Sequence, residues 1–207
     1  MLGGYSWRVT HVDWKQRAAQ VTQSGDEGRS RWSGTGQPIR YELCQAMRDV
    51  LLGAELPATL SQRAVQALDD LRKDFEWLDA ASTAIVRKKD GVRWWTFGGL
   101  YANAAIASRL KAEHGYSVAP NNLALKIGGE PSDSAVANAI HTIRALDAET
   151  FRPEVTAKAL EGLKFSACLP PELASRVLQR RMTDSDAVRR ALAEPARLVT
   201  VTDASSN

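Results

Sequence analysis

The feature that most constrains the fold is a β-hairpin signal near the middle of the chain. The dipeptide Asp90-Gly91 stands between two β-prone runs, and an Asp-Gly pair is typical of a two-residue hairpin turn. The turn sets the register of the two strands, so it also sets which side chains share a face of the sheet. We expect four cross-strand pairs: Val86 with Trp95, Ala84 with Phe97, Arg87 with Trp94, and Lys88 with Arg93.

Periodicity predicts the other elements. Alternating apolar and polar residues indicate strands over 5–10 and 17–22, with shorter strands at 31–33, 123–127 and 198–201. Apolar residues at helical spacing indicate helices over 38–52 and 60–78, one from 99 to 111, and four more that begin near 133, 153, 171 and 184. In the first helix the expected buried stripe is Ile39, Leu43, Met47, Val50 and Leu51.

These elements predict an α+β fold. We expect a small antiparallel β module, barrel-like, in which residues 5–33 and 82–127 contribute strands and helices are inserted between them. The expected division is a β-rich module over 1–130, a helical C-terminal part over 131–201 packed on it, and a frayed tail over 202–207.

Composition excludes several classes of protein. Hydrophobic residues make up 44% of the 207 residues and charged residues 25%, which is ordinary for a globular domain and unlike a disordered chain. No apolar run approaches the ~20 residues that span a bilayer. The N-terminus has no secretory signal, so we expect a cytoplasmic protein. The two cysteines, Cys44 and Cys168, are too few for a disulfide scaffold, and we expect both to be buried.

No catalytic constellation is visible in the sequence. The phosphate loop of nucleotide hydrolases and the G-x-S-x-G elbow of hydrolases are both absent. The histidines His11, His114 and His141 lie in different predicted elements and lack metal-ligand spacing. We therefore expect no catalysis by this chain alone, no bound metal and no cofactor.

Aromatic and basic residues carry the strongest functional signal. The net charge is +3, and cations gather around the Asp90-Gly91 turn. If Val86 and Trp95 point inward, alternation sends Trp94 outward beside Arg87. An exposed indole among cations suits single-stranded DNA or RNA, because the ring stacks on a base while the cations pair with phosphates. The candidate contact residues are Arg87, Lys88, Lys89, Arg93, Trp94, Arg31 and Trp32.

A structural alternative stands beside this interpretation. Trp94 could instead pack under a helix with Arg87 covering it, and Trp32 could fill a core. For Trp7 and Trp95 we favour the structural role, as fillers of the small sheet. The cations of the C-terminal helices, such as Arg176 and Arg180, alternate with acids and are typical of a solvated face.

Several segments resemble the large helicase-related (Lhr-like) proteins of helicase superfamily 2. LGGYSWRV at 2–9 is similar to the family's L-x-G-R-x-W-R-V strand, with Tyr5 where arginine is common, and RWSGTG at 31–36 is similar to its W-x-G-x-G segment. The likeness continues, in the same order, through YELCQA at 41–46, RWWTFGG at 93–99 with ANA at 102–104, KFS at 164–166 and LPPEL at 169–173.

The resemblance implies a part of an ATP-dependent translocase of nucleic acid. Such proteins carry two motor domains, a winged helix and a C-terminal module of β barrel and helices, and this chain corresponds to that last module. The motor motifs are missing, so the coding sequence is truncated or split, or another chain supplies the motor. We expect an accessory module that contacts single-stranded DNA or RNA. The alternative is a protein-interaction module that docks on helicase motor domains or another partner, with Trp94 and Trp32 as interface anchors.

Overall fold

The structure, a computed structural model, describes residues 6–25, 37–55, 59–88, 91–164 and 168–201. The chain divides into two compact units, Met1–Gln37 and Pro38–Asn207. The sequence placed a boundary near residue 130, whereas the core of the second unit draws on residues from both sides of that point. The predicted tail over 202–207 and the predicted strand over 31–33 lie outside the described residues.

The first unit is a two-stranded antiparallel hairpin of β1 (Ser6–Asp13) and β2 (Ala18–Ser24). Val9 pairs with Val21, and the register shifts between Val9 and His11, which is a β-bulge. Two strands alone enclose no core. Trp7 is accordingly 40% exposed, so its expected role as a core residue is wrong.

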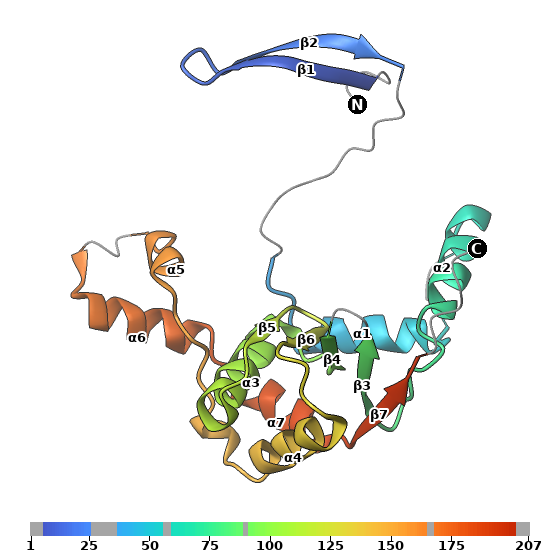
Figure 1. The fold of residues 1–207 in the computed structure, drawn as a ribbon, viewed down its shortest axis with the longest axis vertical. Helices are drawn as coiled ribbons and strands as arrows, with labels where there is room; N and C mark the ends of the chain where they lie inside the picture. Colours follow the sequence, from blue (N-terminus) through green and yellow to red (C-terminus); the bar gives the residue numbers. More distant parts are fainter. Residues whose placement is uncertain (1–5, 26–36, 56–58, 89–90, 165–167, 202–207) are drawn as a thin grey trace. The chain divides into compact units, whose positions relative to one another are not determined.

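The second unit contains a five-stranded sheet and seven α-helices among its described residues (Figure 1). Its strands are β3 (Thr83–Lys88), β4 (Gly91–Trp95), β5 (Val118–Pro120), β6 (Ala124–Ile127) and β7 (Ala196–Thr200). Its α-helices are α1 (Tyr41–Leu51), α2 (Gln62–Lys73), α3 (Gly99–His114), α4 (Asp133–Arg144), α5 (Ala157–Glu161), α6 (Pro171–Arg181) and α7 (Ser185–Ala193), with a 3-10 turn, η1, at Ala148–Thr150.

The sheet has the strand order β5-β6-β4-β3-β7. Its neighbouring strands are antiparallel except for β3 and β7, which run parallel. The α+β class is therefore confirmed, but the described strands form an open sheet with two edges and no closed barrel. The N-terminal strands form a separate sheet and do not join this one.

The β3–β4 hairpin exists as predicted, but its register differs by two residues. Trp95 pairs with Ala84, Trp94 with Ile85, and Lys88 with Gly91. Gly91 is thus a strand residue and not part of the turn. A Cβ at this position would lie 3.3 Å from the carbonyl oxygen of Ile127 on β6, so the close approach of the strands favours glycine. A shift of two residues leaves the same residues together on each face of the strand pair.

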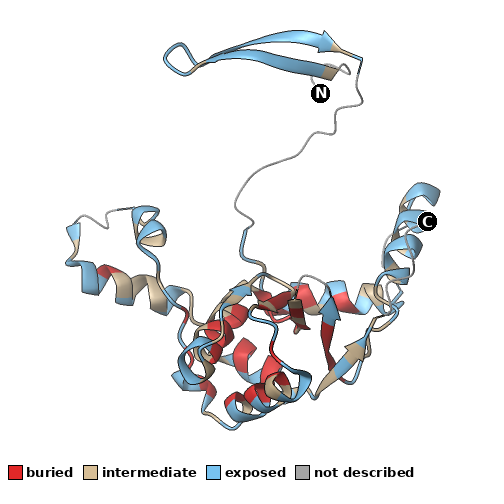
Figure 2. Cartoon of the chain, viewed as in Figure 1, coloured by how far each residue is buried: buried red, intermediate tan, exposed pale blue. Residues whose placement is uncertain are grey.

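Both faces of the sheet are covered over much of their area. Ile85, Val92 and Trp94 point to the face that packs with α3, α4 and α7 in the main core, and buried residues concentrate there in Figure 2. The other face also has buried residues, including Ala84 and Val86. The sequence argument assumed one buried face, so the outward orientation predicted for Trp94 is wrong.

Helix α4 is positioned as its sequence predicts. Ser132 caps its first turn by accepting a hydrogen bond from the Ala135 amide. Its apolar residues at helical spacing, Val136, Ile140 and Ile143, are buried. Among the described residues, no helix combines the length and the apolar character needed to cross a membrane.

Candidate functional site

The expected centre of the nucleic-acid site lies inside the protein. Trp94 is fully buried, and its indole Nε1 donates a hydrogen bond to Thr83 Oγ1 at 2.9 Å. Arg87 forms an ion pair with Asp133, from Nη2 to Oδ1 at 2.5 Å, and also donates to the Pro131 carbonyl at 2.6 Å. The stacking surface that the sequence predicted around Trp94 is therefore absent. The same burial removes Trp94 as an interface anchor.

The other predicted contact residues differ in how far they are exposed. Lys88 is exposed at the end of β3, and Arg93 is half-buried in β4. Lys89, Arg31 and Trp32 lie outside the described residues. Lys88 and Arg93 share a face of the sheet, and it is the face opposite Trp94.

Cations dominate the strands of the five-stranded sheet. These described strands contain no acidic residue and five basic ones: Arg87, Lys88, Arg93, Lys126 and Arg197. Two of them are committed to structure, because Arg87 pairs with Asp133 and Arg197 contacts Ser82, Asp79 and the Trp77 carbonyl. Lys88, Arg93 and Lys126 lie on one face, on three neighbouring strands, where Arg93 and Lys126 also have contacts within the protein.

We call the surface formed by Lys88, Arg93 and Lys126 the basic sheet face. Arg93 lies directly opposite Lys126 in the β4–β6 ladder, and Lys88 lies opposite Gly91. A Cβ at Gly91 would lie 3.8 Å from Lys126 Cε, so the lysine side chain reaches across β4 at this point. Like charges placed opposite each other on a sheet are destabilising. The three residues therefore concentrate positive charge on this face of the sheet.

Trp95, on the same face, belongs to an aromatic cluster. Its ring centroid lies 5.2 Å from that of Phe75, 5.4 Å from that of Trp77 and 6.0 Å from that of Phe97. These contacts anchor the segment after α2 to the sheet. Trp95 is half-buried, which agrees with the structural role that the sequence favoured for it.

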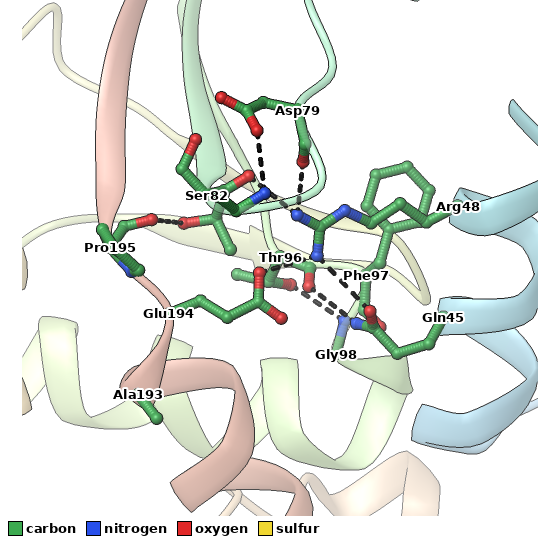
Figure 3. Close-up of polar contacts among 12 residues, drawn as sticks. Gln45, Arg48, Asp79, Ser82, Thr96, Phe97, Gly98, Ala193, Glu194 and Pro195 are labelled. Carbon is green, nitrogen blue, oxygen red and sulfur yellow. Dashed lines mark hydrogen bonds and ion pairs between the residues drawn. The ribbon is translucent and has the colours of Figure 1, made fainter. Parts of the chain in front are cut away.

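A second polar site, which we call the Arg48 cluster, was missed from the sequence (Figure 3). Arg48 on α1 is buried, and its guanidinium pairs with Glu194 at 2.6 Å. The same group donates to the carbonyl oxygens of Asp79 at 2.6 Å and Ser82 at 2.8 Å. Gln45, one turn earlier, donates to the Phe97 carbonyl at 3.1 Å. The cluster joins α1 to the start of β3 and the end of α7.

Buried groups on α1 have shifted acidities. Burial raises the pKa of Tyr41, and the negative charge of Glu194 raises it further. Arg190 lies over the Tyr41 ring at 4.2 Å and acts in the opposite direction. Burial also raises the pKa of the Cys44 thiol, which disfavours the reactive thiolate. Cys44 is buried as expected, whereas Cys168 is exposed, so the prediction for Cys168 is wrong.

Neither site has the arrangement of a catalytic centre. Both Nη atoms of Arg48 donate their hydrogen bonds to other groups of the protein, which is typical of a structural buried ion pair. No group of three His, Cys, Asp or Glu residues that could hold a metal ion occurs in the described part of the chain.

Comparison with protein families, with curated proteins and with solved structures found no match. The resemblance to Lhr-like helicases thus stays a prediction from the sequence.

Proposed function

We propose that this chain binds single-stranded nucleic acid through the basic sheet face. The observation that supports the proposal is the gathering of Lys88, Arg93 and Lys126 on one face whose described strand residues include no acid. Cations on neighbouring strands suit a chain of phosphates, because each phosphate carries a negative charge and accepts hydrogen bonds.

The expected mode of binding is electrostatic. Trp94 is buried and Trp95 is enclosed by three aromatic rings, so neither gives an open platform for stacking a base. Phosphate contacts position a strand but carry no sequence information. We therefore expect weak dependence on base sequence and strong dependence on salt.

The role that follows is that of an accessory module. These 207 residues include no nucleotide phosphate loop, so ATP-driven movement along a strand would need motor domains outside them. The basic sheet face would then hold the strand while the motor domains move it. The resemblance to the C-terminal region of Lhr-like helicases agrees with this role.

The first test is the salt dependence of binding. A fluorescently labelled single strand of about 15 nucleotides would be titrated with the full chain, and anisotropy would be measured. Three phosphate contacts predict a slope of about −2 in the logarithm of the association constant against that of the salt concentration. Affinity should fall about 20-fold between about 50 and 200 mM salt. Undetectable binding at the lower salt concentration would contradict the proposal.

The second test locates the site. Replacing Lys88 and Lys126 together by alanine should remove two of the three contacts and reduce the salt slope to about −0.7. The matched control replaces Arg176 and Arg180, two exposed cations of α6, and removes the same charge. If the control variant loses as much affinity as the first, the basic sheet face is not the binding site.

A further inference from the structure

Helix α1 places its apolar stripe outward. The stripe that the sequence assigned to the core includes Leu43 and Met47, which are 57% and 39% exposed. The buried face consists of Tyr41, Cys44 and Arg48. An amphipathic helix of a domain that is complete by itself turns its apolar stripe toward the core. Within the second unit, the described residues leave Leu43 and Met47 on the apolar face of α1 uncovered.

The Arg48 cluster holds α1 in this orientation. A rotation that buried Leu43 and Met47 would pull Arg48 out of its contacts with Glu194 and the carbonyls of Asp79 and Ser82. Breaking a buried ion pair by removing one partner is strongly destabilising. The exposure of the stripe is thus built into the fold.

Helix α2 extends the same apolar surface. None of its residues is buried, and Leu71 on its apolar stripe is 45% exposed (Figure 2). It is held to α1 by Arg72, whose guanidinium donates two hydrogen bonds, of 2.8 and 3.1 Å, to the Val50 carbonyl near the end of α1. The aromatic cluster around Phe75 fixes the segment that follows. The two apolar stripes are therefore held beside each other.

An open groove of about 430 Å³ lies between the two helices, and we call it the α1–α2 groove. All of its lining residues are apolar: Leu43, Ala46, Met47, Val50, Leu51, Leu68, Leu71, Phe75, Phe97 and Leu123. Sites for small molecules place a few polar groups that orient the ligand. A groove that is lined only by apolar side chains fits the apolar face of a helix instead. Such a helix binds through its side chains at i, i+3, i+4 and i+7.

Exposed acids lie along the rim of the groove, together with one exposed cation, Arg40, three positions before the lining residue Leu43. Asp49 follows the lining residue Ala46 by three positions, and Asp74 follows Leu71 by three, so both lie beside the groove on the helix surface. Glu76 directly follows Phe75. All three carboxylates belong to exposed residues, and no ion pair joins them to the described cations.

We propose that the α1–α2 groove binds an amphipathic helix of another protein, one whose apolar stripe is flanked by lysines or arginines. The apolar stripe would fill the groove, and the flanking cations would pair with Asp49, Asp74 and Glu76. This site is separate from the basic sheet face, and it recognises the opposite charge. A strand of nucleic acid is repelled by this rim, so the two surfaces can be occupied by different ligands.

The experiment uses two synthetic peptides with the same leucine stripe at helical spacing. One carries lysines beside the stripe, and the other carries glutamates at the same positions. Binding to the full chain would be measured by calorimetry at low salt. We expect the lysine peptide to bind about tenfold more tightly than the glutamate peptide, from two to three rim pairs. Equal affinities would overturn the assignment of a basic partner.

Variants of the groove give the second readout. Leu43→Asp with Leu71→Asp should abolish binding of the lysine peptide, whereas Leu173→Asp, on the exposed face of α6, should leave it unchanged. Asp49→Lys with Asp74→Lys should reverse the preference between the two peptides. These rim residues are exposed, so this variant keeps the proposal testable even if the leucine variants unfold, which circular dichroism would report.

Sedimentation distinguishes a second copy of this chain from another protein. A dimer that forms at high concentration and is lost in the Leu71→Asp variant would make the groove a self-association surface and overturn the proposal. A chain that stays monomeric while binding the lysine peptide would support it. Affinity for single-stranded nucleic acid should be the same in the Leu71→Asp variant, so this proposal and the proposed function fail independently.

Discussion

Helices α1 and α4 have similar sequence patterns and opposite orientations. Each shows apolar residues at helical spacing, and each was expected to bury them. In α4 the stripe of Val136, Ile140 and Ile143 is in the core, whereas in α1 the stripe that includes Leu43 and Met47 faces outward. The comparison teaches that periodicity identifies an apolar face, but that the contacts of the other face decide which one is buried.

The polar side of α1 binds inside the protein through the buried Arg48, whereas α4 makes its polar contacts at its two ends, through Asp133 with Arg87 and through Arg144 with the Leu192 carbonyl. Arg48 finds a carboxylate and two carbonyl oxygens inside the protein, and the carbonyls would lack a donor without it. Buried polar groups are costly unless they are hydrogen-bonded. The polar contacts of the Arg48 cluster thus stabilise the protein more than the burial of two or three apolar side chains of α1 would. A partner that covers those side chains would add to this difference.

Removing Arg48 tests most directly whether the Arg48 cluster orients α1. Arg48→Met keeps an unbranched side chain but removes the guanidinium, so Glu194 loses its partner and the carbonyls of Asp79 and Ser82 lose this donor. We expect the free energy of unfolding to fall by about 4 kcal/mol. Urea unfolding followed by circular dichroism measures this change.

Arg189→Met is the control for that measurement. Arg189 pairs with Asp186 and Glu149 at the surface, where such pairs contribute little, so we expect a loss within about 1 kcal/mol. If the Arg48 variant were no less stable than this control, the cluster would not be what orients α1.

Much of the fold could be predicted from the sequence. The α+β class, the hairpin after β3 and the stripe of α4 follow from local patterns, because turn residues and periodicity act over a few neighbours. The register of the hairpin could not be predicted to the residue. Gly91 stands in the strand, where its φ of +119° and the tight approach of the Ile127 carbonyl, 3.3 Å from a Cβ, both disfavour a side chain, and the second contact spans 36 residues.

The candidate site could be predicted only in part. Lys88 and Arg93 were identified as contact residues, but Trp94 was assigned the exposed side because one buried face was assumed for the sheet. Whether both faces of the sheet are covered depends on helices that are distant from β4 in the sequence. Lys126 was missed because it stands alone in an apolar run and joins Arg93 only through strand pairing. Arg48 gave no local signal beyond its place on the side of the helix away from Leu43.

A matched pair of truncations compares the contribution of the two apolar stripes to stability. Ile143→Ala in α4 removes a fully buried side chain, and we expect a loss of about 3 kcal/mol of unfolding free energy. Leu43→Ala in α1 removes a side chain that is more than half exposed, and we expect a change within about 0.5 kcal/mol. Chemical unfolding of both variants measures the difference. Similar losses would show that the stripe of α1 is buried in solution.

The smallest expected effect concerns Tyr41, on the buried face of α1. Its pKa is raised in the folded state, first by burial and then by the charge of Glu194. The folded protein therefore holds this proton more tightly than the unfolded chain does. The resulting stabilisation is fully present below the unfolded pKa, near 10, and is lost as pH rises through the folded value. The slope contributed by one such group cannot exceed about 1.4 kcal/mol per pH unit.

Tyr41→Phe isolates this effect, because the substitution keeps the ring under Arg190 and removes the hydroxyl. Unfolding free energies would be measured in urea at about pH 9 and about pH 11 for both proteins. The wild-type protein should lose more stability over this interval than the variant, by less than the limit for a single proton. An identical loss in both proteins would mean that water reaches the Tyr41 hydroxyl. The polar face of α1 would then be solvated like its apolar face, and the contrast with α4 would no longer rest on burial.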